Sequence, residues 1–287
     1  MHILIFGFNG QVAMELRTQA KDSGVKVTAL DRASADLMDP ASCGQAIRDI
    51  VPDAVINAAA YTAVDNAETD EATAHTVNAE APEAMALACA DIHVPFVTIS
   101  TDYVFSGDGT KAWRPEDTPA PQGAYGRTKL AGERAVQSAG GAYAILRTSW
   151  VVSAHGNNFV KTMLRLGAER DGLTIVADQI GGATGAAEIA AACLKIAQAL
   201  KTAPEKSGVY HFSGAPDVSW ADFAREIFTQ ANLNCAVTDI PSSDYPTPAT
   251  RPLNSRMDCA TTKETFDIDR PDWKESLRDI LSELEMI

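Results

Sequence analysis

The chain has 287 residues, with 24 lysines and arginines against 38 aspartates and glutamates, which gives a formal net charge of −14 at pH 7. An acidic balance of this size argues against a nucleic-acid-binding surface and against a polybasic membrane patch. The five cysteines are scattered without Cys-x-x-Cys spacing, which is typical of reduced thiols. Without a signal peptide or a run of about 20 apolar residues, the sequence predicts a cytoplasmic protein with one large domain or two.

The N-terminal segment predicts a nucleotide-binding turn. Residues 2–6 form an apolar run, typical of a buried parallel strand, and glycines follow at positions 7 and 10 before a predicted helix over residues 11–22. Glycines between a strand and a helix let a phosphate approach the backbone N–H groups of the helix N-terminus. We therefore expect Gly7 and Gly10 to contact a dinucleotide.

The second predicted strand, residues 25–30, ends beside two charged residues that favour different cofactors. Asp31 lies about 20 residues past the glycines, where an acid suits a ribose hydroxyl of NADH. Arg32 could instead meet the 2′-phosphate of NADPH. Each residue also has a structural interpretation, Asp31 as a strand-end turn residue and Arg32 as a solvated charge. The sequence therefore leaves NADH and NADPH open.

Polar side chains follow the apolar strand predicted over residues 94–99. These are Ser100, Thr101 and Asp102. Because ligands bind beyond the carboxyl ends of the strands in open α/β sheets, we expect these residues at the site. As structure alone, the same three residues could cap a turn.

A helix predicted over residues 122–139 carries a second candidate group. Tyr125 and Lys129 lie four residues apart and therefore project from one face, one turn apart. An ammonium near a phenol favours the phenolate, so the pair could pass a proton to or from a substrate oxygen. The alternative is an amphipathic helix with an exposed lysine and a tyrosine packed by its ring.

The remaining elements complete an α/β pattern. Further helices are predicted over residues 40–50 and 71–92, strands over 54–58 and 142–147, and a loop over 107–122. Beyond residue 150 we predict helices over 157–170, 184–200 and 220–231, strands over 173–176 and 209–212, and an irregular segment over 241–252. The pattern predicts a Rossmann-type doubly wound parallel sheet in residues 1–150, which later segments can rejoin. Residues 151–287 are expected to form mainly a smaller α/β substrate-binding domain.

These segments together resemble the extended short-chain dehydrogenase/reductase superfamily, and most closely its dTDP-4-dehydrorhamnose reductase branch. The glycine turn is common to the superfamily, whereas Ser-Thr-Asp-Tyr-Val-Phe at 100–105 and Arg-Thr-Ser-Trp at 147–150 are more specific to this branch. The resemblance implies that NADPH or NADH reduces the C4 ketone of dTDP-4-dehydro-6-deoxy-L-mannose (dTDP-4-dehydro-β-L-rhamnose), which yields dTDP-L-rhamnose.

The resemblance also implies roles for single residues. Tyr125 would donate the proton, Lys129 would lower the pKa of the phenol and hold the nicotinamide ribose, and Thr101 would polarise the carbonyl. Asp102 and Trp150 would contact the sugar, although Trp150 could also be a core tryptophan. Asn157 and Asn158 could bind substrate or act as caps. Further cofactor contacts are implied at Gln11, Val12, Asp36, Leu37, Ala60, Tyr61, Thr62 and Ile99.

Three alternatives are compared with this assignment. A nucleotide-sugar 4,6-dehydratase pairs the aspartate with a glutamate base, but Tyr103 follows Asp102 here. A non-catalytic regulatory subunit of the methionine adenosyltransferase type resembles the branch, and the intact Tyr125, Lys129 and Thr101 argue against it. Another nucleotide-sugar 4-ketoreductase stays open.

The resemblance also points to one metal site to consider, because some relatives hold a divalent ion between glutamates at a dimer interface. Glu15 and Glu283 fall at comparable places, but the third position is shifted, with Ala187 followed by Glu188. The resemblance therefore leaves two interpretations open, a structural Mg²⁺ at a homodimer interface and a set of solvated helix glutamates, and the shifted third position favours the second. The histidines show no ligand spacing, so no catalytic metal is expected.

Overall fold

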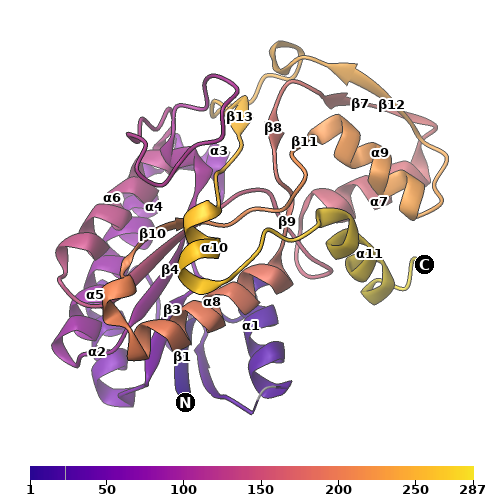
Figure 1. Cartoon of the computed structure of the whole chain (residues 1–287). Helices are drawn as coiled ribbons and strands as arrows, with labels where there is room; N and C mark the ends of the chain where they lie inside the picture. The colour runs from indigo at the N-terminus through magenta and orange to yellow at the C-terminus, as the bar shows by residue number, and fades with distance from the viewer. Residues whose placement is uncertain (23) are drawn as a thin grey trace.

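A six-stranded parallel sheet forms the centre of the computed structural model, which describes residues 1–22 and 24–287 (Figure 1). Its strand order is β10-β5-β4-β3-β1-β2. The strands are β1 (His2–Phe6), β2 (Lys26–Leu30), β3 (Ala54–Asn57), β4 (Phe96–Thr101), β5 (Tyr143–Thr148) and β10 (Gly208–His211). The chain steps outward from β1 to β2 and then returns to β3 on the other side of β1. The order therefore reverses between β1 and β3, and ligands bind at such a switch point in doubly wound sheets.

Helices cover both faces of this sheet, because its buried strands alternate their side chains between two apolar layers. Ile3 and Ile5 of β1 face one core with α1 (Gln11–Asp22) and α8 (Ala186–Thr202), whereas Leu4 and Phe6 face the other. The second core includes residues of α2 (Pro40–Ile50), α5 (Ala81–Asp91) and α6 (Ala124–Ser138). The predicted Rossmann-type sheet is thereby confirmed.

The helix predicted over residues 71–92 is divided into three parts. It consists of α4 (Glu71–His75), the π-helical turn η1 (Thr76–Glu80) and α5, and the short α3 (Val64–Ala67) precedes it. π-Helical turns re-aim side chains inside a helix and are frequent at functional sites. Here the turn carries Asn78, which is buried and whose side chain donates to the carbonyl oxygen of Tyr61 at 3.1 Å.

A smaller region lies to one side of the sheet and has its own apolar core (Figure 1). It contains α7 (Phe159–Glu169), α9 (Trp220–Gln230), α11 (Trp273–Glu283) and the paired strands β7 (Gly172–Val176) and β12 (Ala236–Ile240). Ser219 caps α9, and its hydroxyl accepts the N–H of Asp222 at 2.9 Å. The elements β12 and α11 were not predicted.

The remaining elements are short. They are β6 (Val151–Val152), β8 (Ile180–Gly181), β9 (Thr184–Gly185), β11 (Val218–Ser219), β13 (Asn254–Ser255), η2 (Asp102–Val104), η3 (Pro204–Lys206), η4 (Ser242–Asp244) and α10 (Ala260–Phe266). Strands β11, β8 and β13 form one small sheet and β6 and β9 another. The later elements α8 and β10 lie with the main sheet, while the division near residue 150 stays a prediction. Among residues 1–22 and 24–287, no helix is long and apolar enough to cross a bilayer.

Candidate active site

Two neighbouring cavities lie at the carboxyl ends of the central strands. The first has a volume of about 600 Å³ and the second about 480 Å³, and both are lined by Gly7, Asn9, Ala59 and Ala60. The residues expected at the site line one cavity or the other, apart from Asn158. The first cavity takes Gly7, Gly10, Gln11, Val12, Ala60, Thr62, Ile99, Thr101, Asp102, Tyr125, Lys129 and Trp150. The second takes Asp31, Arg32, Asp36, Leu37 and Tyr61.

The glycine turn after β1 is built for a close approach to the backbone. Gly7 has a φ of 117°, and a Cβ atom there would lie 3.3 Å from the Cβ of Ala13 and 3.4 Å from the carbonyl group of Ala58. A side chain at Gly7 would therefore be strained and crowded. Helix α1 follows, and the N–H of Met14 donates to the carbonyl oxygen of Gly10 at 2.9 Å. The first N–H groups of α1 are thus left to bind an anion, which suits the phosphates of a dinucleotide.

The Gln11 side chain joins α1 to the segment after β6. Its amide oxygen accepts the Ser153 hydroxyl at 2.8 Å and the Asn158 amide at 2.9 Å. Asn158 also caps α7 by accepting the N–H of Lys161 at 3.2 Å. Of the two asparagines considered as substrate contacts, Asn158 therefore has the structural role of a cap, and Asn157 lines the first cavity.

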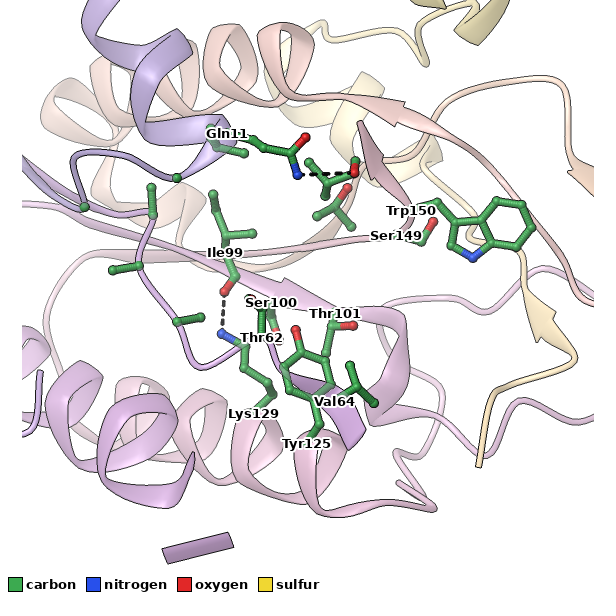
Figure 2. A pocket seen from close by; sticks show the side chains of 18 of the residues that line it. Gln11, Thr62, Val64, Ile99, Ser100, Thr101, Tyr125, Lys129, Ser149 and Trp150 are labelled. Carbon is green, nitrogen blue, oxygen red and sulfur yellow. Dashed lines mark hydrogen bonds between the residues drawn. The ribbon is translucent and has the colours of Figure 1, made fainter. Parts of the chain in front are cut away.

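Tyr125 and Lys129 both project from α6 into the first cavity (Figure 2). Lys129 is buried and its ammonium donates to the carbonyl oxygen of Ile99 at 2.7 Å, so the alternative of an exposed lysine is wrong. Burial lowers the pKa of Lys129 to about 8, although the negative charge of Glu133 raises it.

The phenol of Tyr125 is a weak acid. Burial raises the pKa of Tyr125 to about 12, the negative charge of Asp102 adds to this effect, and hydrogen bonding with Thr101 opposes it. The direction is opposite to the lowering expected from Lys129, because the loss of solvent around the phenolate outweighs the other effects. The phenol therefore stays protonated at neutral pH.

Asp102 has a hydrogen-bond donor on each carboxylate oxygen. The hydroxyl of Thr101 donates to one oxygen at 3.0 Å, and the hydroxyl of Ser255 in β13 donates to the other at 2.5 Å. Burial raises the pKa of Asp102 to about 6, and both hydroxyl donors lower it. Sequence reasoning missed Ser255, because nothing in its local sequence shows that it meets a residue 153 positions away.

Trp150 stands at the far end of the cavity from Lys129 (Figure 2). Its ring stacks on Trp220 of α9, with the ring centroids 3.6 Å apart and an interplanar angle of 13°. A Cβ atom at Gly181 would lie 3.0 Å from the Trp150 ring, so the glycine in β8 leaves room for it. The stack places the indole at the junction of the two regions.

Asn78 is a second positioning residue that the sequence did not reveal. Its side chain accepts the N–H of Tyr61 at 2.9 Å and donates to the Thr128 hydroxyl of α6 at 3.2 Å. A Cβ atom at Gly132 would lie 2.0 Å from the Asn78 carbonyl oxygen. The close packing of α6 against η1 therefore fixes the loop that lines both cavities.

Asp31 and Arg32, which favour NADH and NADPH respectively in the sequence, both line the second cavity. Asp31 accepts the N–H of Ser34 at 2.9 Å and its hydroxyl at 2.7 Å, both through Oδ1. Arg32 forms an exposed ion pair with Asp36, with 3.3 Å between Nε and Oδ2. The aspartate thus shapes a strand-end turn and still faces the cavity, while the arginine is held only by a surface pair, which contributes little energy.

The glutamates considered for Mg²⁺ are arranged differently from the expectation. The imidazole of His155 lies between two of them, with Nε2 3.3 Å from Glu15 and 3.5 Å from Glu283. Glu188 instead accepts the hydroxyl of Ser276 at 2.5 Å. His155, and not Glu188, is therefore the third member of the cluster with Glu15 and Glu283. Sequence reasoning missed it because the three residues are far apart in the chain. Mg²⁺ prefers oxygen ligands to an imidazole nitrogen, so this donor set gives no specific support for Mg²⁺.

Residues 1–286 match the family model described as the RmlD substrate binding domain. The chain belongs to this family. A dTDP-4-dehydrorhamnose reductase of Sinorhizobium fredii is similar to this RmlD-family chain, with 42% identity over 284 residues, which cover 97% of the chain and 96% of the relative. Family membership confirms the resemblance found in the sequence.

Solved structures of the same reductase extend the similarity to the fold. The enzyme from Clostridium acetobutylicum has a TM-score of 0.93 and 36% identity, and the match covers 99% of this chain and 100% of that chain. The enzyme from Bacillus anthracis, solved in complex with NADP, has a TM-score of 0.92 and 34% identity over 98% and 99% of the two chains. The RmlD-family fold of this chain is therefore shared over its full length.

Proposed function

We propose that the protein reduces the C4 ketone of dTDP-4-dehydro-β-L-rhamnose to give dTDP-L-rhamnose, with NADPH or NADH as the reductant. The observation that carries this proposal is the meeting of Tyr125, Lys129 and Thr101 in one cavity beside the glycine turn. The relatives named dTDP-4-dehydrorhamnose reductase, and the NADP bound to one of them, support the same reaction.

The cavity residues can perform the proton half of this reduction. A bound reduced nicotinamide would supply the hydride that adds to the carbonyl carbon. The carbonyl oxygen then gains negative charge, and Tyr125 gives it the phenol proton. Because burial keeps this phenol protonated at neutral pH, Tyr125 already carries the proton when the substrate binds.

The neighbouring side chains bind and orient. We assign Lys129 to the nicotinamide ribose and to the charge that Tyr125 acquires, and Thr101 to the substrate oxygen. Asp102 and Trp150 contact the sugar in this proposal. Gly7 and Gly10, with Gln11 and Val12 at the start of α1, bind the cofactor phosphates, while the second cavity takes the adenosine.

The reaction class is tested by substrate choice. Tyr103 stands where a dehydratase needs its carboxylate base, so elimination has no proton acceptor there. We expect one NADPH to be consumed for each 4-keto-6-deoxy sugar nucleotide converted to a 4-hydroxy product. We also expect no loss of water from dTDP-glucose during incubation with catalytic NAD, as measured by mass spectrometry.

The same assay separates the alternatives. A dehydrated product from dTDP-glucose would contradict the reductase assignment. Reduction of a nucleotide sugar with a different base at an equal rate would indicate a broader 4-ketoreductase. Binding of NADPH without turnover of any 4-keto sugar would favour a non-catalytic regulatory role.

The homodimer stays a prediction, and light scattering of the purified protein measures the molar mass that tests it.

Cofactor choice gives a further prediction. Asp31 can accept a hydrogen bond from the ribose of NADH, and Arg32 can leave its surface pair with Asp36 for a 2′-phosphate. We therefore expect the wild-type protein to use both cofactors. Asp31→Ala should raise the KM for NADH more than the KM for NADPH, because only NADH loses a partner while NADPH loses a repelling charge.

Ser34→Ala is the matched control for this substitution. It removes the hydroxyl that donates to Asp31 at 2.7 Å but keeps the carboxylate. We expect it to alter the two KM values far less than Asp31→Ala does. Equal losses of NADH and NADPH affinity in Asp31→Ala would mean that the carboxylate only shapes the turn and does not distinguish the riboses.

A further inference from the structure

A buried carboxylate lies one helical turn beyond Lys129. Glu133 of α6 is only 3% exposed and accepts three hydrogen bonds. The Ser100 hydroxyl donates to it at 2.5 Å, and the Arg147 guanidinium donates through Nε at 3.0 Å and through Nη2 at 2.6 Å. A charge this deep is stable only when it is paired and hydrogen-bonded, and this one is satisfied on both oxygens.

The same carboxylate fixes the catalytic helix to the strand that ends at the site. Lys129 donates to the carbonyl oxygen of Ile99, and Ser100, the next residue of β4, donates to Glu133. Two successive turns of α6 are thus bonded to two successive residues of β4. Because Thr101 follows directly, these bonds determine where Tyr125 stands relative to Thr101.

Arg147 connects this pair to the loop over residues 106–122. Its Nη1 atom donates to the carbonyl oxygen of Pro115 at 3.2 Å and lies 3.4 Å from Nε2 of His211. Burial and the charge of Arg147 lower the pKa of His211 to about 3, so this imidazole is neutral. Glu133 is therefore the carboxylate that balances the buried guanidinium, which otherwise would add positive charge near Lys129.

We propose that Glu133 is a positioning residue that acts on the reduction through Lys129, by placing a negative charge one turn along α6 from its ammonium and by fixing α6 against Ser100. This role rests on the proposed function for its effect on catalysis. Arg147 is the counter-charge that pairs with the Glu133 carboxylate and holds it where Ser100 donates to it.

The charges around Lys129 give this role a pH signature. Glu133 lies one turn along α6 from Lys129, and Arg147 of β5 pairs with Glu133. Tyr125 and Asp102 line the first cavity together with Lys129. With the negative charge of Glu133 removed and Arg147 left in place, the Lys129 ammonium loses the attraction of that charge. Its pKa then falls below the present value of about 8, so the charged form is lost at a lower pH.

Glu133→Gln is the test, because glutamine keeps the acceptor for Ser100 and removes the charge. We expect the alkaline limb of the kcat profile, measured with NADPH and dTDP-4-dehydro-β-L-rhamnose, to move to lower pH. Each unit of pKa lost lowers the charged fraction about tenfold on the alkaline side. For a fall of one unit in the pKa of Lys129 from about 8, we therefore expect kcat to fall about fivefold at pH 8 and to be nearly unchanged at pH 6. A loss by the same factor at every pH would overturn the proposal.

Two further variants keep the test decisive. Glu133→Gln combined with Arg147→Met removes both charges together, so this double variant is expected to fold even if Glu133→Gln alone does not. The alkaline limb of its kcat profile should lie between those of the wild type and Glu133→Gln. A limb equal to that of the wild type would overturn the proposal. Glu226→Gln changes a carboxylate of α9 that pairs with Lys274, and its pH profile should match the wild type.

Cofactor binding separates this proposal from the proposed reaction. In a fluorescence titration with NADPH alone, the Glu133→Gln affinity should weaken toward alkaline pH at a lower pH than the wild-type affinity does. If the wild type reduces no 4-keto sugar nucleotide but this shift is present, the proposed reaction fails and the role of Glu133 at Lys129 stands. If the NADPH affinities of the two proteins vary identically with pH, the role of Glu133 is wrong.

Discussion

Replacement of Tyr125 by phenylalanine is expected to lower kcat by about 10²–10⁴-fold, the usual contribution of general acid catalysis. The substitution removes the phenol proton that the alkoxide needs and changes little else, because the ring still packs edge-on against Tyr103 at a centroid distance of 5.5 Å. The affinity for NADPH should remain close to that of the wild type. Steady-state kinetics and a fluorescence titration measure the two quantities.

Tyr210→Phe is the matched control for the loss of a phenol hydroxyl. The Tyr210 hydroxyl donates to the carbonyl oxygen of Lys206 at 2.6 Å, at the edge strand β10 and away from the cavity. Its removal should leave kcat within about threefold of the wild type, since it loses one hydrogen bond of about 1 kcal/mol in stability. Near-normal turnover in Tyr125→Phe would show that another group supplies the proton.

Arg147→Met is expected to lower the free energy of unfolding by about 3–5 kcal/mol, the usual cost of removing one partner from a buried ion pair. Methionine fills much of the space but leaves the Glu133 carboxylate, which is 3% exposed, without its two guanidinium hydrogen bonds. It also frees the carbonyl oxygen of Pro115. Urea unfolding followed by circular dichroism measures the change.

Arg165→Met provides the comparison on the surface. Arg165 pairs with Glu169 one turn later in α7, and both side chains are more than half exposed. Pairs of this kind contribute about 0.3–0.5 kcal/mol, so the control should be nearly neutral. A similarly small effect of Arg147→Met would mean that Glu133 finds solvent or a proton at little cost.

The main sheet could be predicted because its strands and helices have strong local patterns. The apolar runs at residues 2–6 and 54–57 are typical of strands buried on both faces, and the glycines after residue 6 mark the turn into α1. Ser100, Thr101 and Asp102 followed from the rule that ligands bind beyond the carboxyl ends of parallel strands, whereas most of the other cavity residues followed from the family resemblance. Both kinds of inference depend on neighbours in the chain.

The features that were missed depend on contacts between distant segments. Strands of two residues, such as β13, have no period to detect, and the sequence around Ser255 does not reveal its bond to Asp102. Lys129 was expected to make the Tyr125 phenol more acidic, but burial has the larger effect and cannot be read from the spacing of the two residues. His155 meets Glu15 and Glu283 only in the folded chain.

The strand order has a consequence for synthesis of the chain from its N-terminus. Strand β5 pairs on one side with β4, but its partner on the other side is β10, made about 60 residues later. Until Gly208–His211 has left the ribosome, the backbone groups on that side of the apolar β5 lack their native partner. Such an edge can pair with other chains. The yield of folded protein therefore depends on how nascent chains are shielded during this interval, which the stability of the finished fold does not reveal.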